Sequence, residues 1–391
     1  MAVNELVWLL LPVAAASGWW AARRTALKAS ERRARTTPAY FRGLNYLLNE
    51  EPDKAIDVFV RLLEVDSETV EIHLALGSLF RRRGEVERAI RIHQNLIARS
   101  TLDDEQRANA LLELGMDYMR AGLFDRAENL FLELKEARQH MRQALQNLLI
   151  VYQQERDWRA CLKVTEELEP LVSERMGLAR SHYYCELAEQ ALRKKEPERA
   201  NDLLKKARRE DPDCVRSLHL QARLAMEALD CPKAIELLRE VAEQDPGYLP
   251  EILGDLRSCH ARLGDLAGLR SYLEERLKDA AEVDIISTLS EIIMETEGEG
   301  AALTFMTRQM EERPTIRGLL SLIELNSSMP DVRAGQILVR LKDHMERLLA
   351  ERPPYQCNKC GYSAKTMHWQ CPSCRSWSTI RRKTEPQEIC R

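Results

Sequence analysis

Aromatic residues are scarce in this sequence, and the motifs of the common enzyme classes are absent. Phe, Trp and Tyr make up 6% of the 391 residues, whereas charged residues make up 31%. The chain has no phosphate-binding P-loop, no His-Glu-x-x-His motif, no nucleophile elbow and no glycine fingerprint for dinucleotides. These absences favour a protein that is not an enzyme and that works by binding other proteins.

A basic surface is also missing from most of the chain. Residues 23–35 carry six basic side chains and one acidic one, but the residues from 36 onward are net negative. Binding to a phosphate backbone requires a basic stripe. The closing segment 355–391 has seven basic side chains against two acidic ones, so nucleic-acid binding stays a minor alternative.

The ten cysteines show no disulfide framework, and six of them stand alone in the sequence. These six are Cys161, Cys185, Cys214, Cys231, Cys259 and Cys390. The first five fall within helical patterns, which is typical of reduced thiols that act as small apolar side chains. The sequence therefore predicts a reducing compartment.

One uncharged segment near the start has the length of a membrane span. Residues 6–22 would extend roughly 25 Å as a helix, close to the ~30 Å hydrocarbon layer of a bilayer. Trp8 lies near one end and Trp19 and Trp20 at the other, where indole rings favour the membrane boundary. The basic segment 23–35 follows directly, so the positive-inside rule places the rest of the chain in the cytoplasm.

A cleaved secretory signal is the alternative interpretation of this segment. However, the residues before it include Glu5 and no Lys or Arg, which is the reverse of a signal peptide. Export would also bring ten cysteines into an oxidising compartment. A permanent anchor is therefore expected.

The middle of the chain repeats with a period near 34 residues. Three segments begin at Gly43, Gly77 and Gly115, and each has an aromatic residue three positions later and an alanine twelve positions later. This pattern resembles the tetratricopeptide repeat, in which a small residue on one helix lets an aromatic of the other approach closely. Such helix pairs stack into a superhelix with a concave surface. An irregular helical bundle is the alternative.

The same positions can be followed along the chain. The small position is occupied by Ala55, Ala89, Ala127, Cys161, Ala200, Ala234, Gly268 and Ala302. The aromatic position holds Tyr46, Phe80, Tyr118 and Tyr152, and then Ala191, Ala225, Cys259 and Ile293. Residues 315–350 are expected to form a last helical pair or cap, with one apolar stripe of Ile337, Leu338, Leu341, Met345, Leu348 and Leu349.

Two Cys-x2-Cys pairs follow the repeats. Cys357 and Cys360 form the first pair, and Cys371 and Cys374 form the second after ten intervening residues. Two such turns brought face to face give a closed, tetrahedral four-thiolate site, which is structural rather than catalytic. Because so short a segment lacks an adequate core, the metal is expected to supply its folding energy. Two unrelated disulfides are the alternative.

Zinc and iron fit an all-thiolate site about equally. The segments "CNKCG" and "CPSC" resemble rubredoxin knuckles, although Arg375 stands where the second rubredoxin knuckle usually has glycine. We leave His368 out of the ligand set, since four cysteines satisfy the geometry. The nearby aromatics are expected to form a small apolar shell beside the metal: Tyr355, Tyr362, Trp369 and Trp377.

These features together resemble the lipopolysaccharide assembly protein B family of Gram-negative bacteria, along the full length of the chain. The resemblance implies a single-pass protein of the bacterial inner membrane, with its bulk on the cytoplasmic side. It implies an adaptor that promotes proteolysis of the deacetylase of the committed lipid A step by a membrane AAA+ protease. It also implies partners among other lipopolysaccharide synthesis and transport proteins.

The expected fold is therefore all-α: a tetratricopeptide superhelix with an N-terminal transmembrane helix and a small rubredoxin-like ribbon. The expected parts are an anchor (1–22), a basic juxtamembrane segment (23–35), eight to nine helix pairs (36–352) and the ribbon with its tail (353–391). A redox carrier with an iron-loaded ribbon is the alternative function. Such a protein would be coloured and would bleach reversibly on reduction.

Overall fold

The computed structural model describes most of the repeats and the ribbon. The described residues are 19–20, 41–43, 45–46, 49, 51–65, 70–173, 175–279, 283–312, 314–326, 340–347 and 353–383. The basic segment and nearly all of the expected anchor lie outside these ranges. Among the described residues, no helix has both the length and the apolar character needed to span a bilayer.

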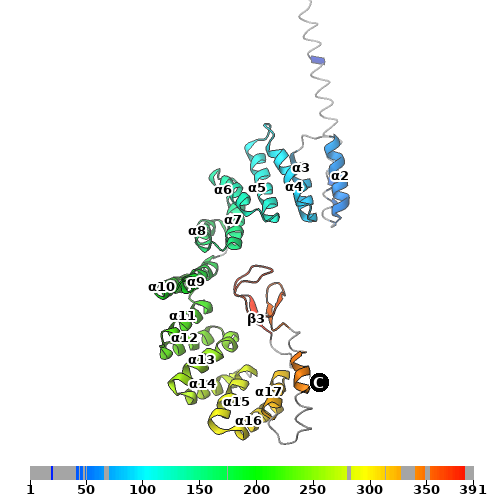
Figure 1. Ribbon diagram of the computed structural model, residues 1–391. Helices are drawn as coiled ribbons and strands as arrows, with labels where there is room; N and C mark the ends of the chain where they lie inside the picture. Colours follow the sequence, from blue (N-terminus) through cyan, green and yellow to red (C-terminus); the bar gives the residue numbers. More distant parts are fainter. Residues whose placement is uncertain are drawn as a thin grey trace, which may run out of the picture. The chain divides into compact units, whose positions relative to one another are not determined.

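The chain divides into two compact units, Met1–Glu174 and Arg175–Arg391 (Figure 1). The helices of the first unit are α2 (Pro52–Val65), α3 (Val70–Arg83), α4 (Val86–Ile97), α5 (Asp104–Arg120), α6 (Phe124–Glu136), α7 (Met141–Glu155) and α8 (Trp158–Leu168), followed by the 3-10 turn η1 (Glu169–Leu171). Each helix packs against the next along the chain, as the repeat predicts.

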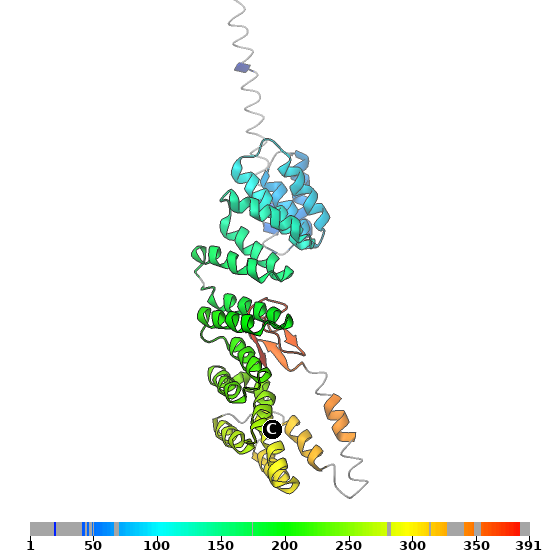
Figure 2. The same ribbon diagram turned by 60° about the vertical axis from the view of Figure 1, so that its left-hand side comes forward.

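The second unit continues the same pattern and ends in a small sheet (Figure 2). Its helices are α9 (Gly177–Arg193), α10 (Pro197–Glu210), α11 (Val215–Glu227), α12 (Cys231–Gln244), the 3-10 turn η2 (Pro246–Tyr248), α13 (Leu249–Leu263), α14 (Leu266–Asp279), α15 (Val283–Glu297), α16 (Glu299–Glu312) and α17 (Ile316–Asn326). The strands β1 (Tyr355–Cys357), β2 (Ser363–Ala364) and β3 (Ile380–Arg382) form one antiparallel sheet in the order β2-β1-β3. The prediction of an all-α repeat fold with a terminal ribbon is confirmed.

The small position of the repeat is the fourth residue of the second helix in each pair. It is fully buried in seven units: Ala55, Ala89, Ala127, Cys161, Ala200, Ala234 and Ala302. Gly268 was the wrong assignment. The side chain of Asp265 accepts a hydrogen bond from the backbone N–H of Gly268, so α14 begins at Leu266 and its fourth residue is Leu269, which is fully buried.

The close approach within a pair is made by the glycine of the first helix. A Cβ added at Gly77 would lie 2.4 Å from His93, and one at Gly115 would lie 2.5 Å from Phe131. The aromatic of the first helix packs as expected where Phe80 shares one buried cluster with Ala89, and it makes a further contact. The rings of Phe80 and Tyr118 lie under guanidinium groups of the second helix, at 5.0 and 5.7 Å.

Gly115→Ala should therefore destabilise the contact between α5 and α6. Forcing an added methyl group against the rigid ring of Phe131 destabilises the fold by about 1–3 kcal/mol. The better helix propensity of alanine offsets about 1 kcal/mol of this loss. Native-state hydrogen exchange should show faster opening of α5 and α6. Gly254→Ala in α13 is the matched control, because a Cβ there meets nothing within 4 Å and should slow exchange slightly. Unchanged exchange in the Gly115 variant would show that Phe131 can move aside.

The expected cap at residues 315–350 is only partly described. The helix α17 covers its first part. Most of the predicted apolar stripe lies outside the described residues, and Leu341, which is described, is 46% exposed. The stripe therefore stays a prediction.

Candidate metal centre and its contacts with the repeats

Two turns of the same geometry carry the four predicted ligands. In the first, the backbone N–H of Cys357 donates to Tyr362 O, and that of Gly361 donates to Cys357 O. In the second, the N–H of Cys371 donates to Ser376 O, and that of Arg375 donates to Cys371 O. The turns therefore hold the two cysteine pairs in equivalent positions.

Both turns require a residue with positive φ directly after the second cysteine. Gly361 adopts φ 76° at no steric cost, whereas Arg375 adopts φ 57°. A residue with a Cβ pays roughly 1–2 kcal/mol in this region. The departure from the rubredoxin pattern at Arg375 therefore leaves the turn geometry intact and places a small strain in the second knuckle.

The structure brings the four predicted sulfur atoms together, all within 4.8 Å of one another. The Sγ atoms of Cys357 and Cys374 are 3.7 Å apart, as are those of Cys360 and Cys371. A tetrahedron with metal–sulfur bonds of about 2.3 Å has edges of about 3.8 Å. The four cysteines therefore fit a single tetrahedral metal ion with no open coordination position.

Hydroxyl groups stabilise two of the thiolates. The hydroxyl of Thr379 lies 3.3 Å from Cys357 Sγ and, with backbone N–H groups, lowers the pKa of that thiol to about 6. The hydroxyl of Ser376 likewise lowers the pKa of Cys374. Burial raises the pKa of Cys371 to about 11. A bound cation would supply the charge that keeps this buried sulfur deprotonated.

His368 does not join the cluster. Its Nε2 lies 3.2 Å from the hydroxyl of Thr366, and the group of potential ligands in the described part of the chain contains the four cysteines alone. The decision to leave His368 out of the ligand set agrees with this arrangement.

The aromatic residues of the ribbon are placed differently from the expectation. Tyr355 packs beside the cysteines together with Met367 and Ile380, but Tyr362 is 38% exposed. Trp369 packs against the core of the repeats. The expectation of an apolar shell beside the metal is therefore wrong for the tryptophans, because their rings pack against residues of the repeats instead.

Trp377 is held by α9. Its ring stacks on the imidazole of His182 at 4.6 Å with the planes 13° apart, and Tyr183 meets its edge at 5.9 Å. The His182 Nε2 atom lies 2.8 Å from the hydroxyl of Ser378. Burial lowers the pKa of His182 to about 3, so this imidazole is neutral at physiological pH. No pattern in the sequence indicates a role for His182, because its partner Ser378 lies 196 residues away.

Trp369 occupies a second position on the repeats. Its ring lies 5.2 Å from that of Tyr248 and 5.6 Å from the guanidinium of Arg216. Arg216 is 3% exposed and pairs with Glu186 at 2.8 Å and Glu189 at 2.7 Å. The two carboxylates fix the guanidinium against the tryptophan, where a cation and an aromatic face attract each other.

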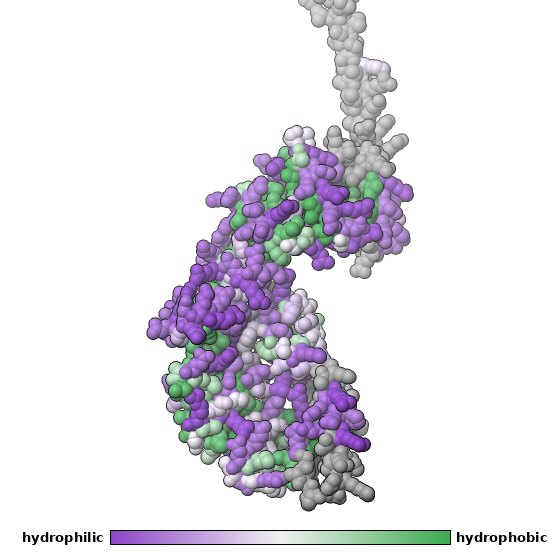
Figure 3. Space-filling view, in the orientation of Figure 1, coloured by the Kyte–Doolittle hydropathy of each residue, from purple (hydrophilic) through white to green (hydrophobic). Residues whose placement is uncertain are grey.

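Polar contacts complete the docking of the ribbon. The Tyr355 hydroxyl donates to Glu251 at 2.7 Å. Two ion pairs add to this hydrogen bond: Arg381 with Asp245 at 3.0 Å and Arg382 with Asp284 at 2.9 Å. Glu251 and Asp284 belong to α13 and α15, the first helices of successive pairs, and Asp245 lies directly before η2. On the face seen in Figure 3, the surface around α9 and α10 is hydrophilic.

Comparison with known proteins agrees with these features. Residues 355–382 match a family described as a rubredoxin metal binding domain, and residues 72–108 and 185–249 match tetratricopeptide repeats. The chain is 40% identical over 379 residues to lipopolysaccharide assembly protein B of Escherichia coli K12, covering 96% of this chain and 97% of the relative. It is 34% identical to the protein of that name from Haemophilus influenzae, over 96% and 98% of the two chains.

Proposed function

This chain belongs to the lipopolysaccharide assembly protein B family, and we propose on that basis that it is a non-enzymatic, membrane-anchored adaptor in lipopolysaccharide biosynthesis. The family relation extends along nearly the whole chain, so the repeats and the ribbon are inherited together. In this proposal residues 1–22 fix the protein in the bacterial inner membrane. The repeats and the ribbon work on the cytoplasmic side.

The adaptor binds the deacetylase of the committed lipid A step and presents it to a membrane AAA+ protease. It also holds other lipopolysaccharide synthesis and transport proteins together at the membrane. Confinement of adaptor, protease and substrate to one membrane raises their effective concentration without any new contact. The adaptor thus limits the amount of the deacetylase by mass action rather than by chemistry.

The docked ribbon is the observation that carries this proposal. A closed four-sulfur site has no position for substrate. The side chains around the site serve protein contacts instead, with Trp369 and Trp377 inserted against the repeats. A metal that organises a protein surface fits an adaptor better than it fits an enzyme.

The half-life of the deacetylase in growing cells tests the proposal. Removal of residues 1–22, or Trp377→Ala, should lengthen this half-life at equal adaptor abundance. Lys205→Ala is the control, since this side chain is 56% exposed and its ion-pair partner among the described residues is Asp202 of the same helix. A deacetylase half-life that stays the same when the whole adaptor is absent would refute the proposal.

A further inference from the structure

A groove runs along one face of α12 in the second unit. It has a volume of about 490 Å³, and its lining residues recur at helical spacing along this helix: Pro232, Ile235, Glu236, Arg239, Glu240 and Glu243. At 1.5 Å per residue they extend over roughly 16 Å, the length of about five residues of an extended peptide. We call this surface the Arg239 groove. Pro232 and Ile235 form its apolar end, and its other lining residues are charged.

The helices on both sides of α12 contribute to the groove. Glu240 pairs with Arg208 of α10, and Glu243 lies 3.9 Å from Arg276 of α14. The helices α10, α12 and α14 are the second helices of three successive pairs. The ribbon, in contrast, is held by residues of the first helices α9, α11 and α13. The Arg239 groove and the docked ribbon therefore use different helices of the same unit.

The charges along the groove are matched with one exception. Each lining glutamate has a basic neighbour, since Glu236 pairs with Lys233 at 2.8 Å and the other two pair with Arg208 and Arg276. In the described part of the chain, Arg239 has no carboxylate within ion-pair distance. The groove therefore has one positive charge that no described residue neutralises.

Arg239 is held by an aromatic ring instead of an acidic side chain. Its guanidinium lies 4.9 Å from the ring centre of Tyr272 on α14, and that of Arg276 lies 5.4 Å from the same ring. Among the described residues, the buried Nε of Arg239 and the buried hydroxyl of Tyr272 both lack a hydrogen-bond partner, so the two side chains meet through the ring alone. A buried donor without a partner costs about 1–3 kcal/mol. An anionic ligand at Arg239 would offset this cost.

We propose that the Arg239 groove binds a carboxylate on a short extended segment of a partner protein. A planar guanidinium binds a carboxylate through two parallel hydrogen bonds, and one negative charge matches the one unpaired positive charge. Ile235 is one helical turn from Arg239, roughly 6 Å, and side chains two residues apart on an extended peptide have a similar spacing. The segment therefore has an apolar residue two positions before its carboxylate.

A phosphate group matches the groove less well than a carboxylate does. It carries about −1.5 to −2 charges at neutral pH. Three glutamates lie along the groove, and one basic side chain is unpaired. The binding of an acidic segment does not require the proposed role in lipopolysaccharide biosynthesis, because it follows from the charges of this groove alone.

Binding of short peptides to the full-length, metal-loaded protein in detergent tests the proposal. The peptide Gly-Leu-Gly-Glu-Gly, with both ends blocked, should bind at least about tenfold more tightly than Gly-Leu-Gly-Gln-Gly, which has the same shape without the charge. The peptide Gly-Gly-Leu-Gly with a free carboxyl end is compared with its amide. This second comparison distinguishes a chain terminus from an acidic side chain as the source of the carboxylate.

Three variants locate the binding site. Arg239→Gln should abolish the preference for the Glu peptide, and Arg239→Lys should weaken its binding several-fold, because lysine retains the charge without the planar pair of donors. Arg223→Gln is the matched control, since it removes the same charge from an exposed position of α11 outside the groove. It should keep the full preference. Hydrogen exchange of α12 should be the same in all three variants, because Arg239 makes no ion pair with a described residue.

Four results would overturn the proposal. The first two are equal binding of the Glu and Gln peptides, and no binding of either carboxylate peptide at about 1 mM. The third is an equal loss of binding in the Arg223→Gln and Arg239→Gln variants, which would show a general effect of charge. The fourth is tighter binding of Gly-Leu-Gly-phosphoserine-Gly than of the Glu peptide, which would assign the groove to phosphate.

Discussion

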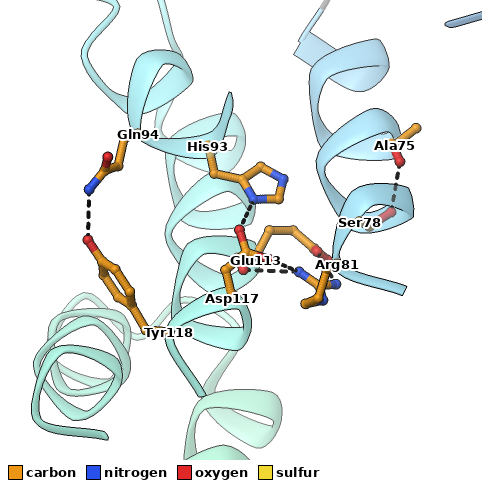
Figure 4. Close-up of polar contacts among 8 residues, drawn as sticks. All are labelled: Ala75, Ser78, Arg81, His93, Gln94, Glu113, Asp117 and Tyr118. Atoms are coloured by element: carbon orange, nitrogen blue, oxygen red, sulfur yellow. Dashed lines mark hydrogen bonds and ion pairs between the residues drawn. The ribbon is translucent and has the colours of Figure 1, made fainter. Parts of the chain in front are cut away.

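Replacing Arg81 by alanine is expected to destabilise the first unit by about 3–5 kcal/mol. Figure 4 shows the guanidinium of Arg81 on α3 between two carboxylates of α5. Its Nη1 lies 2.7 Å from Asp117 Oδ1, and its Nη2 lies 2.7 Å from Glu113 Oε2. Asp117 is fully buried, and its other oxygen lies 2.5 Å from Nδ1 of the equally buried His93.

The size of the effect follows from what the substitution leaves behind. Burial lowers the pKa of Arg81, but the charges and hydrogen bonds of Glu113 and Asp117 outweigh burial and raise it, so the guanidinium is charged. Without the Arg81 guanidinium, the Asp117 carboxylate still has His93 as a neighbour, but it no longer has a permanent positive charge beside it. An uncompensated buried carboxylate costs far more than a broken surface ion pair.

Urea unfolding of the first unit, followed by hydrogen exchange in α3 to α6, measures this loss. Arg83→Ala is the control in the same unit. Its 2.7 Å pair with Asp53 is exposed on both sides, so the change should be within about 1 kcal/mol. Adding Asp117→Asn to the Arg81 variant should recover part of the stability. A loss no larger than that of the control would show that His93 alone balances the charge.

The repeat made the helix pairs predictable, because the pattern is local. The seven small residues that were assigned correctly all lie in the first turn of a helix. The number of residues between them is the length of one helix pair. The assignment of Gly268 to the small position is wrong because it depends on the period alone. The side chain of Asp265 fixes the start of α14, and a period carried over from earlier units cannot detect a shift of one residue.

The metal site was equally predictable, and its surroundings were not. Each cysteine pair spans one turn, so the spacing of Cys357 and Cys360 already defines their geometry. The contacts of His182 with Trp377, or of Arg81 with Asp117, join residues of different helices or domains. No periodicity records such pairings, because they depend on how stacked helices and the ribbon meet.

Loss of the metal is expected to unfold the ribbon and leave the helices intact. The strands have three, two and three residues, and few apolar side chains are buried among them. A structural zinc site of this type contributes an apparent 10–16 kcal/mol, roughly, in small domains, which is more than such a core supplies. Cys371→Ser, which removes a fully buried ligand, should therefore have the same effect as a chelator.

Three measurements distinguish this outcome from general unfolding. Far-UV circular dichroism should change little, because the helices of both units do not require the metal. Tryptophan fluorescence should shift to the red as Trp369 and Trp377 leave their contacts with Tyr248 and His182. Hydrogen exchange should rise in α9 and α11, since these helices lose the side chains that cover them.

Two variants separate metal binding from docking. Ser373→Ala changes an exposed residue of the second knuckle and retains every sulfur, so it should bind metal and dock normally. Trp377→Ala should keep the metal but raise exchange in α9, because the ring stacked on His182 is gone. A ribbon whose amides stay protected after complete metal removal would contradict the prediction. The docking contacts with the repeats would then be sufficient to fold it, and the metal would serve another purpose.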